Sequence, residues 1–504
     1  MLKQSKISCY NFSKGGLMKR CFDARKFLKI QKKKINERIK MFDKLYLEFG
    51  GKLIDDQHAA RTLPGYLPDL KIRLFQEFKD EAEVILCINA EAIEKSKIRA
   101  DHMITYESEV LRLIEFLRAR EITVNSVVIT LFDGQKKAKD FAKKLEDYKV
   151  KVYFHTFTKG YPTDVDTIVS EEGYGANPYI ETTKPLVIVS APGPGSGKLA
   201  TSLSQLYHES KRGKKVGYAK FETFPVWDLP LKHPVNVAYE AATADLNDKN
   251  MIDNFHLEKY GISAVNYNRD LETFPVLKEI LTRISGKSIY NSPTDMGVNV
   301  IGQCITDDKA VQRAAKDEII RRYLRALTDL KKGIVDEDVP KRIKMLMNEL
   351  GISEADRPVI AKAEEKRKKA GDKPSACLAV GKKYIVGRKT DYLSPISSTF
   401  LNAIKTLTKI PDEVDLIAPS ILKPILDIKN QVSNFAKKQL NLDEVLIALS
   451  ICSTTNPIAK KALENLEKLQ GAELHATHLI PDDELVVLAN LGVNATCGVE
   501  LDLG

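Results

Sequence analysis

The sequence LVIVSAPGPGSGKLAT, residues 186–201, joins an apolar strand to a glycine-rich loop and the beginning of a helix. An apolar run of this length between turn residues is typical of a strand buried in a parallel sheet. Glycines in such a loop let backbone N–H groups approach an anion, and the N-terminus of the following helix adds partial positive charge. The stretch therefore predicts an α/β fold with a phosphate-type loop, whose candidate ligands are Gly193, Gly195, Ser196, Gly197, Lys198 and Thr201.

This loop departs from the standard nucleotide-binding pattern at two positions. The first glycine of that pattern falls on Pro192, and the hydroxyl residue that holds magnesium falls on Leu199. Thr201 lies too far along the chain to be assigned that role. The cofactor is therefore undetermined, with a nucleotide and magnesium as the candidate. The plainer interpretation is a tight strand-to-helix turn whose glycines only satisfy backbone geometry.

Strand and helix patterns alternate on both sides of this stretch. Further strands are expected at residues 45–49, 84–89, 126–132, 151–155 and 216–221, and helices at 26–42, 107–118 and 135–148. Strands that alternate with helices of this length predict βαβ units. The N-terminal part is therefore expected to be a Rossmann-like parallel sheet.

Composition divides the chain into four parts. Residues 1–22 form a basic extension that is expected to be disordered, with an organelle presequence or a start at Met18 as alternatives. Residues 23–230 form the N-terminal α/β domain, 231–372 a polar segment and helical middle region, and 373–504 a C-terminal α/β domain. In the last part we expect a hairpin at 376–388 and strands at 413–418 and 473–477, alternating with helices.

Charge and apolar patterning exclude several classes of partner. The net charge of +10 comes from residues 1–40, where thirteen Lys or Arg face two acidic residues, so a nucleic-acid footprint is not expected. The apolar runs are much shorter than the ~20 residues of a membrane span. Seven scattered cysteines without a C-x-x-C pair fit a reducing compartment. The long helical region 307–332 leaves a homo-oligomer open, because its apolar stripe suits a subunit interface or intramolecular packing equally well.

A polar segment downstream of the loop supplies the candidate catalytic residues, which are His233, Asp245, His256, Arg269, Asp270 and Asp295. Asp253 and His256 lie three residues apart and are therefore able to share a metal or a proton on one helix face. Taken singly, each of these residues is better explained as a helix cap or a surface hydrogen bond. Taken together, after a phosphate-type loop, they predict the wall of a pocket.

Several long strings resemble a known family. They are Leu45–Leu53, Gly160–Asp166, Ala191–Lys198, Gly217–Pro225, Leu231–Asn236, Tyr267–Asp270 and Ser292–Asn299. Together they are similar to the mainly bacterial family called domain of unknown function number 1846, from about Phe22 to the C-terminus. The resemblance implies a cytoplasmic protein with an N-terminal α/β part, a helical middle and a three-layer α/β C-terminal unit. It implies no reaction and no catalytic residues.

Three functions follow from these patterns. The leading hypothesis is an enzyme that binds a nucleotide or phosphometabolite and transfers a phosphoryl or nucleotidyl group, with Lys198 as the electrostatic clamp. The second is a non-catalytic anion or nucleotide sensor or scaffold, which Pro192 and Leu199 favour. The third is a metal-dependent hydrolase centred on Asp245, Asp253 and His256.

Overall fold

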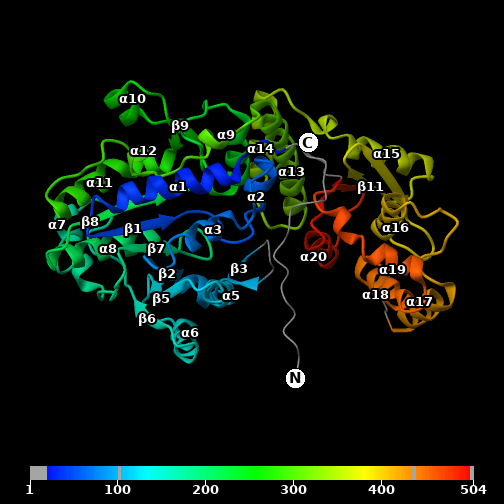
Figure 1. Cartoon of the computed structure of the whole chain (residues 1–504), viewed down its shortest axis with the longest axis horizontal. Helices are drawn as coiled ribbons and strands as arrows, with labels where there is room; N and C mark the ends of the chain where they lie inside the picture. Colours follow the sequence, from blue (N-terminus) through cyan, green and yellow to red (C-terminus); the bar gives the residue numbers. More distant parts are fainter. Residues whose placement is uncertain (1–19, 100–103, 433–438, 500–504) are drawn as a thin grey trace. The chain divides into compact units, whose positions relative to one another are not determined.

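The computed structural model describes residues 20–99, 104–432 and 439–499 of the 504-residue chain. These residues form two units, one of Arg20–Glu318 and one that begins at Ile319 (Figure 1). Residues 231–318, expected in a separate middle region, therefore group with the N-terminal unit. Most of the predicted basic extension lies outside the described residues, but its last two residues, Cys21 and Phe22, are buried.

Six parallel strands form the sheet of the N-terminal unit, in the order β6-β5-β2-β7-β1-β8 (Figure 1). They are β1 (Lys44–Phe49), β2 (Ala82–Asn89), β5 (Thr123–Thr130), β6 (Lys151–Phe154), β7 (Leu186–Ser190) and β8 (Val216–Phe221). The strand of the glycine-rich stretch, β7, lies between β2 and β1, and all five of its residues are buried. The predicted parallel sheet is confirmed.

Helices and short strands complete this unit. They are α1 (Ala24–Ile39), α2 (Gln57–Thr62), α3 (Leu70–Gln76), α4 (Ala90–Glu94), β3 (Ile98–Arg99), β4 (Ile104–Thr105), α5 (Tyr106–Arg118), α6 (Lys136–Asp147), α7 (Val165–Ile168), α8 (Lys198–Lys211), α9 (Pro234–Ala242), β9 (Asn250–Ile252), α10 (Asn254–Tyr260), β10 (Val265–Tyr267), α11 (Asn268–Ser285) and α12 (Pro293–Met296). The helices expected at 26–42, 107–118 and 135–148 are α1, α5 and α6.

One face of the sheet packs against α8 and α11. Side chains alternate between the two faces along each strand, so Tyr46 of β1 and Val187 of β7, which are aligned in register, share this face. Leu206 of α8 and Phe274 of α11 pack onto them in a single buried cluster. This cluster anchors the helix that follows the glycine-rich loop.

Aromatic side chains cover the opposite face. Phe49 at the end of β1 meets Phe75 of α3 edge to face, with ring centroids 4.3 Å apart. Phe221 of β8 lies 4.5 Å from Phe49, and Phe27 of α1 lies 6.4 Å from Phe221. Aromatic pairs at these separations add to the gain from burying their area. Helices α1 and α3 are therefore held on this face.

The C-terminal unit contains a second, mixed sheet in the order β12-β11-β13-β14. Its strands are β11 (Ser375–Val380), β12 (Lys383–Arg388), β13 (Glu473–Ala476) and β14 (Asn494–Cys497). The boundary between the two units falls inside α13 (Asp308–Lys331). The remaining helices of the C-terminal unit are α14 (Asp338–Glu349), α15 (Pro358–Lys369), α16 (Pro395–Thr408), α17 (Pro419–Val432), α18 (Leu442–Ser453), α19 (Pro457–Leu463) and α20 (Asp482–Asn490). The predicted hairpin at 376–388 is present as β11 and β12.

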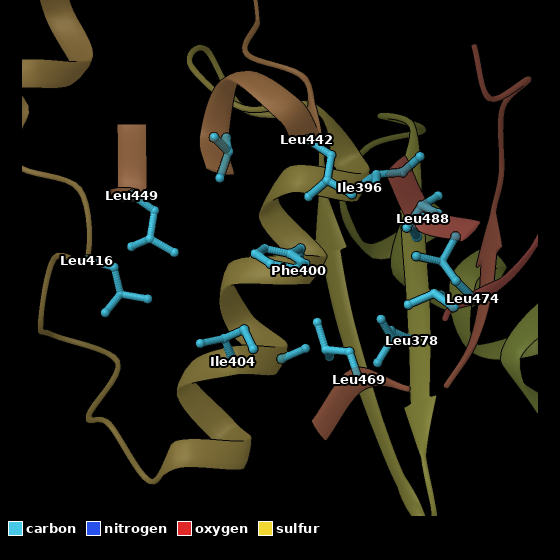
Figure 2. Close-up of a cluster of buried hydrophobic side chains, with 14 of the residues drawn as sticks. Leu378, Ile396, Phe400, Ile404, Leu416, Leu442, Leu449, Leu469, Leu474 and Leu488 are labelled. Atoms are coloured by element: carbon cyan, nitrogen blue, oxygen red, sulfur yellow. The ribbon is translucent and has the colours of Figure 1, made fainter. Parts of the chain in front are cut away.

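An apolar core joins this second sheet to α16 and α18 (Figure 2). Phe400 of α16 is 1% exposed and lies among Leu378 of β11, Leu442 and Leu449 of α18. On the other face of the sheet, Val359 of α15 packs against a separate small cluster. Both faces of the sheet are therefore covered by helices.

The strand expected at 413–418 is absent, and this segment has no regular structure. Its apolar residues Leu416 and Ile417 are nevertheless buried in the core of Figure 2. A short apolar run has the same pattern whether it pairs with a neighbouring strand or fills a core from a loop. The predicted strand at 413–418 is therefore wrong, and its apolar residues fill the core from a loop.

Candidate functional site

The strands β1 and β7 are neighbours in the sheet, so their carboxyl ends lie side by side. From these two ends the chain crosses opposite faces of the sheet. After β1 the chain runs through α2 and α3 to β2, and α3 lies on the aromatic face. After β7 it runs through α8, on the other face, to β8. In open α/β sheets, such a divergence leaves a crevice that is the usual ligand site. Two glycine-containing loops begin there, Gly50–Gly51 and residues 191–197.

The glycines after β7 are required by the backbone. Gly195 and Gly197 have φ angles of 71° and 79°, in the left-handed region where a side chain is strained. A Cβ atom at Gly193 would overlap the hydroxyl group of Tyr106. A Cβ atom at Gly197 would lie 2.8 Å from the side chain of Thr130. The loop therefore needs Gly193 for space, Gly195 for conformation and Gly197 for both.

Side chains from the ends of β2 and β5 hold the carbonyl groups of this loop. Asn89 Nδ2 donates to the carbonyl oxygen of Gly195 at 3.3 Å, and Thr130 Oγ1 donates to that of Ser196 at 3.0 Å. Within the described chain, the backbone N–H groups of Gly195, Gly197 and Lys198 donate no hydrogen bond to another residue. A loop that satisfies its carbonyl oxygens and leaves N–H groups available favours an anion over a cation.

The position that holds magnesium in the standard pattern offers no oxygen, because it is Leu199. Thr201 is fully buried, and its hydroxyl lies near the thiol of Cys87 inside the core without a hydrogen-bond partner among the described residues. Burial is the main reason that the pKa of Cys87 is raised to about 12, so this thiol is not a nucleophile near neutral pH. The residues present therefore do not form a magnesium site of the P-loop type, and no step is assigned to such an ion.

Lys198 extends from the loop to the end of β1. Its Nζ lies 3.7 Å from Glu48 Oε1, and the side chain is 15% exposed. The hydroxyl of Tyr218 on β8 donates to Glu48 Oε2 at 2.8 Å. Glu48, held by Tyr218, therefore orients the Lys198 side chain toward the end of β1.

A second lysine continues this line of charges along β8. Lys220 Nζ lies 2.6 Å from Asp270 Oδ2, at the start of α11, and 3.2 Å from Glu222 Oε2. Burial opposes the charged form of Lys220, but Asp270 and Glu222 outweigh burial and raise the pKa of this lysine. We call Glu48, Lys198, Lys220, Glu222 and Asp270 the charge cluster.

The acidity of Glu222 is altered by its surroundings in the charge cluster. Burial raises the pKa of Glu222 to about 7; Lys220 opposes this rise, whereas Asp270 and Glu48 add to it. Its side chain packs directly on the loop after β1, where a Cβ atom at Gly50 would overlap it. A carboxyl group that titrates near neutral pH in a crevice is suited to donate or accept a proton.

Residues 20–351 match the family described as domain of unknown function DUF1846, N-terminal, and residues 355–502 match its C-terminal counterpart. The chain belongs to the DUF1846 family. A UPF0371 protein of Clostridium botulinum (strain Alaska E43 / Type E3) is 53% identical over 489 residues, which cover 95% of this chain and 97% of that protein. A UPF0371 protein of Clostridioides difficile (strain 630) is 52% identical over 492 residues, which cover 96% and 98%. The resemblance read from the sequence motifs is confirmed.

The candidate catalytic residues of this DUF1846 protein lie in several different places. Asp270 belongs to the charge cluster, and its neighbour Arg269 forms an ion pair with Asp248 at 2.6 Å. His233 caps α9 and lies 2.9 Å from Asp308. Asp245 is exposed on a short 3-10 helix.

His256 and Asp295 line a separate cleft, described below. The neighbouring Asp253 accepts hydrogen bonds from the backbone of His256, as the cap of α10, and from the hydroxyl of Thr294. Among the described residues, no group of three or more His, Cys, Asp or Glu is arranged to hold a metal ion. The geometry therefore gives the metal-dependent hydrolase no support.

Sequence reasoning missed three members of the charge cluster, Glu48, Lys220 and Glu222. A signal for them was present, because they follow or end the predicted strands at 45–49 and 216–221. The rule that places ligands at the carboxyl ends of parallel strands applies to every strand of the sheet.

No helix in the part of the chain that the structure describes combines the length and apolar character of a membrane span.

Proposed function

We propose that this DUF1846 protein is an enzyme that binds a nucleotide or phosphometabolite at Gly193–Lys198 and transfers its phosphoryl or nucleotidyl group. The observation that carries the proposal is the position of the charge cluster. A loop with unused N–H donors, two lysines and a carboxyl group of altered pKa occur together at the point where the chain paths from β1 and β7 diverge. Anion binding and proton transfer are the two functions that such a set supplies.

The roles follow from the chemistry of the transfer. Phosphoryl transfer needs positioning and stabilisation of negative charge more than covalent catalysis. Lys198, at the start of α8, would neutralise the bound phosphate, and Lys220 would stabilise charge that develops during transfer. Glu222 would accept the proton of the attacking hydroxyl, because a base that titrates near pH 7 is efficient at neutral pH.

Binding is tested first, with nucleotides, phosphometabolites and inorganic phosphate in a thermal-shift and calorimetric screen. A ligand at about 100 times its Kd should stabilise the protein by about 2.7 kcal/mol. Lys198→Ala should weaken binding about tenfold to a hundredfold, since it removes a charge-assisted contact. Lys211→Ala is the matched control, because Lys211 is an exposed lysine at the other end of the same helix. Equal binding by both variants would remove the loop from consideration.

Turnover is tested with Glu222→Gln, which keeps the shape of the side chain and removes its proton affinity. It should retain ligand binding and lose about a hundredfold or more of kcat. In the wild type, kcat/KM should rise as the pH passes through about 7, where Glu222 becomes the free base.

The second candidate is a non-catalytic sensor, which Pro192 and Leu199 favour, together with the pairing of Lys198 with Glu48. It predicts Lys198-dependent binding without any product from the bound ligand. Neither wild type nor the Glu222→Gln variant would then convert the bound ligand.

A further inference from the structure

A cleft of about 380 Å³ lies beside α1, α10 and α12 in the N-terminal unit. None of the residues that line it belongs to the glycine-rich loop or to the charge cluster. It contains His256 and Asp295, which the sequence placed in one site with the loop, and the aromatic ring of Trp227. The cleft is therefore a second concave surface with its own polar groups.

One ring nitrogen of His256 has a hydrogen-bond partner among the described residues, and the other has none. The residue is 8% exposed, and its Nδ1 lies 2.9 Å from Ser292 Oγ and 3.7 Å from Asp295 Oδ1. No described residue forms a hydrogen bond with Nε2 of this ring. Nε2 is therefore available to a polar atom of a ligand in the cleft.

Trp227 provides a flat apolar wall next to His256. The indole Nε1 donates to the carbonyl oxygen of Asn299 at 3.0 Å, which fixes the orientation of the ring. The ring centroids of Trp227 and His256 are 6.1 Å apart, in an edge-to-face arrangement. A fixed, partly exposed indole suits a planar ring of a ligand by stacking.

Helix α1 lines the cleft with more positive than negative charge. Lys33, Lys34 and Arg38 face it, against Glu37 on the same helix. Lys33 Nζ lies 3.9 Å from Glu37 Oε1, and Arg38 donates to the carbonyl oxygen of Asp295 at 2.8 Å. Lys34 has no ion pair or side-chain hydrogen bond within the described chain. Its ammonium group is therefore available to an anion.

We propose that this cleft is a second ligand site, for a small molecule that carries a phosphate or carboxylate on a planar ring. The ring stacks on Trp227, a polar atom of the ligand pairs with His256 Nε2, and the anionic group meets Lys34 at the rim. This assignment does not depend on the proposed transfer reaction, because the two sites share no residue.

The chain contains a single tryptophan, so the intrinsic fluorescence of Trp227 reports directly on this cleft. The probes are adenosine monophosphate and benzoate, with adenosine as the ring without an anion and inorganic phosphate as the anion without a ring. Both ringed anions are tested because either anionic group satisfies Lys34. We expect a saturable fluorescence change with at least one of them and a much weaker one with adenosine or phosphate.

Variants then locate the binding. Lys34→Ala should weaken it about tenfold, by loss of one charge-assisted contact, and His256→Asn should weaken it as well. Lys29→Ala is the matched control on α1, because Lys29 is exposed and does not line the cleft. Lys198→Ala should leave the signal unchanged, which separates this site from the glycine-rich loop.

Three results would overturn the proposal. The first is no saturable change with either ringed anion. The second is equal binding by Lys34→Ala and Lys29→Ala. The third is a signal that is lost in Lys198→Ala and kept in Lys34→Ala, because the probe would then occupy the glycine-rich loop. Since Lys34 is exposed, its replacement does not disturb the fold and the test remains decisive if His256→Asn unfolds.

Discussion

Glu222→Gln is expected to stabilise the N-terminal unit at pH 8 although it removes a proposed catalytic group. In the folded protein, burial raises the pKa of Glu222 from an ordinary value of 4.5 to about 7, with Lys220 opposing and Asp270 and Glu48 adding to the rise. The charged form of Glu222 is therefore less favourable in the folded state than in the unfolded chain. An amide of the same shape does not carry that penalty.

The magnitude follows from the linkage between protonation and folding. The folded protein holds this proton up to about pH 7 and the unfolded chain only up to about pH 4.5, so the free energy of unfolding falls as the pH rises between these values. With 1.36 kcal/mol per tenfold change in acid strength, the fall between pH 5 and pH 8 is on the order of 2 kcal/mol. This is an upper bound, because 25% of the side chain is exposed and solvent screens it.

The assay is urea unfolding at pH 5 and pH 8, followed by the fluorescence of Trp227, which lies in the N-terminal unit. The stability of Glu222→Gln relative to wild type should increase from pH 5 to pH 8 by up to the amount above. Glu258→Gln, an exposed change of the same kind on α10, should show no such increase. If the free energies of unfolding of wild type and Glu222→Gln change with pH in the same way, the burial penalty assigned to the Glu222 carboxylate is refuted.

Three further predictions concern the loop, the second core and the cap of α10. Gly197→Ala should lower stability by ~2 kcal/mol and Gly195→Ala by ~1 kcal/mol in chemical denaturation, because both have positive φ but only the first Cβ meets a neighbouring side chain. Phe400→Ala should destabilise the C-terminal unit by ~3–5 kcal/mol in its thermal transition, whereas Ile447→Ala, at a 60% exposed side chain, should change it by less than ~0.5 kcal/mol. Asp253→Ala should cost ~2 kcal/mol of unfolding free energy through loss of a helix cap and a buried hydrogen bond, and elemental analysis should find its metal content equal to that of wild type.

In the proposed site, the same carboxyl group is expected to lower stability and to support turnover, and the two effects can be measured separately. The charge cluster brings three carboxylates and two lysines together at low exposure, and Glu222 is disfavoured in its charged form. Functional sites often retain such locally unfavourable groups, because activity requires them. A variant that gains stability and loses turnover would therefore support a catalytic role better than a variant that loses both.

Local patterns were sufficient for most of the secondary structure. The strands at 186–190 and 216–221 occur at the predicted residues, because apolar runs bounded by turn residues carry that signal within a few positions. The segment 413–418 shows where this signal fails. Leu416 and Ile417 are buried by contacts with distant helices, and no local pattern distinguishes such a loop from a strand.

The sequence by itself determined the parallel sheet, the glycine-rich turn after its central strand and the family, since these depend on residues close together in the chain. Only the tertiary structure decided which polar side chains share a site. It places Glu48, Lys220 and Glu222 beside Lys198, and it assigns His256 and Asp295 to another cleft. The order of strands across a sheet brings together residues that are distant in sequence, and this order cannot be deduced from the spacing of residues along the chain.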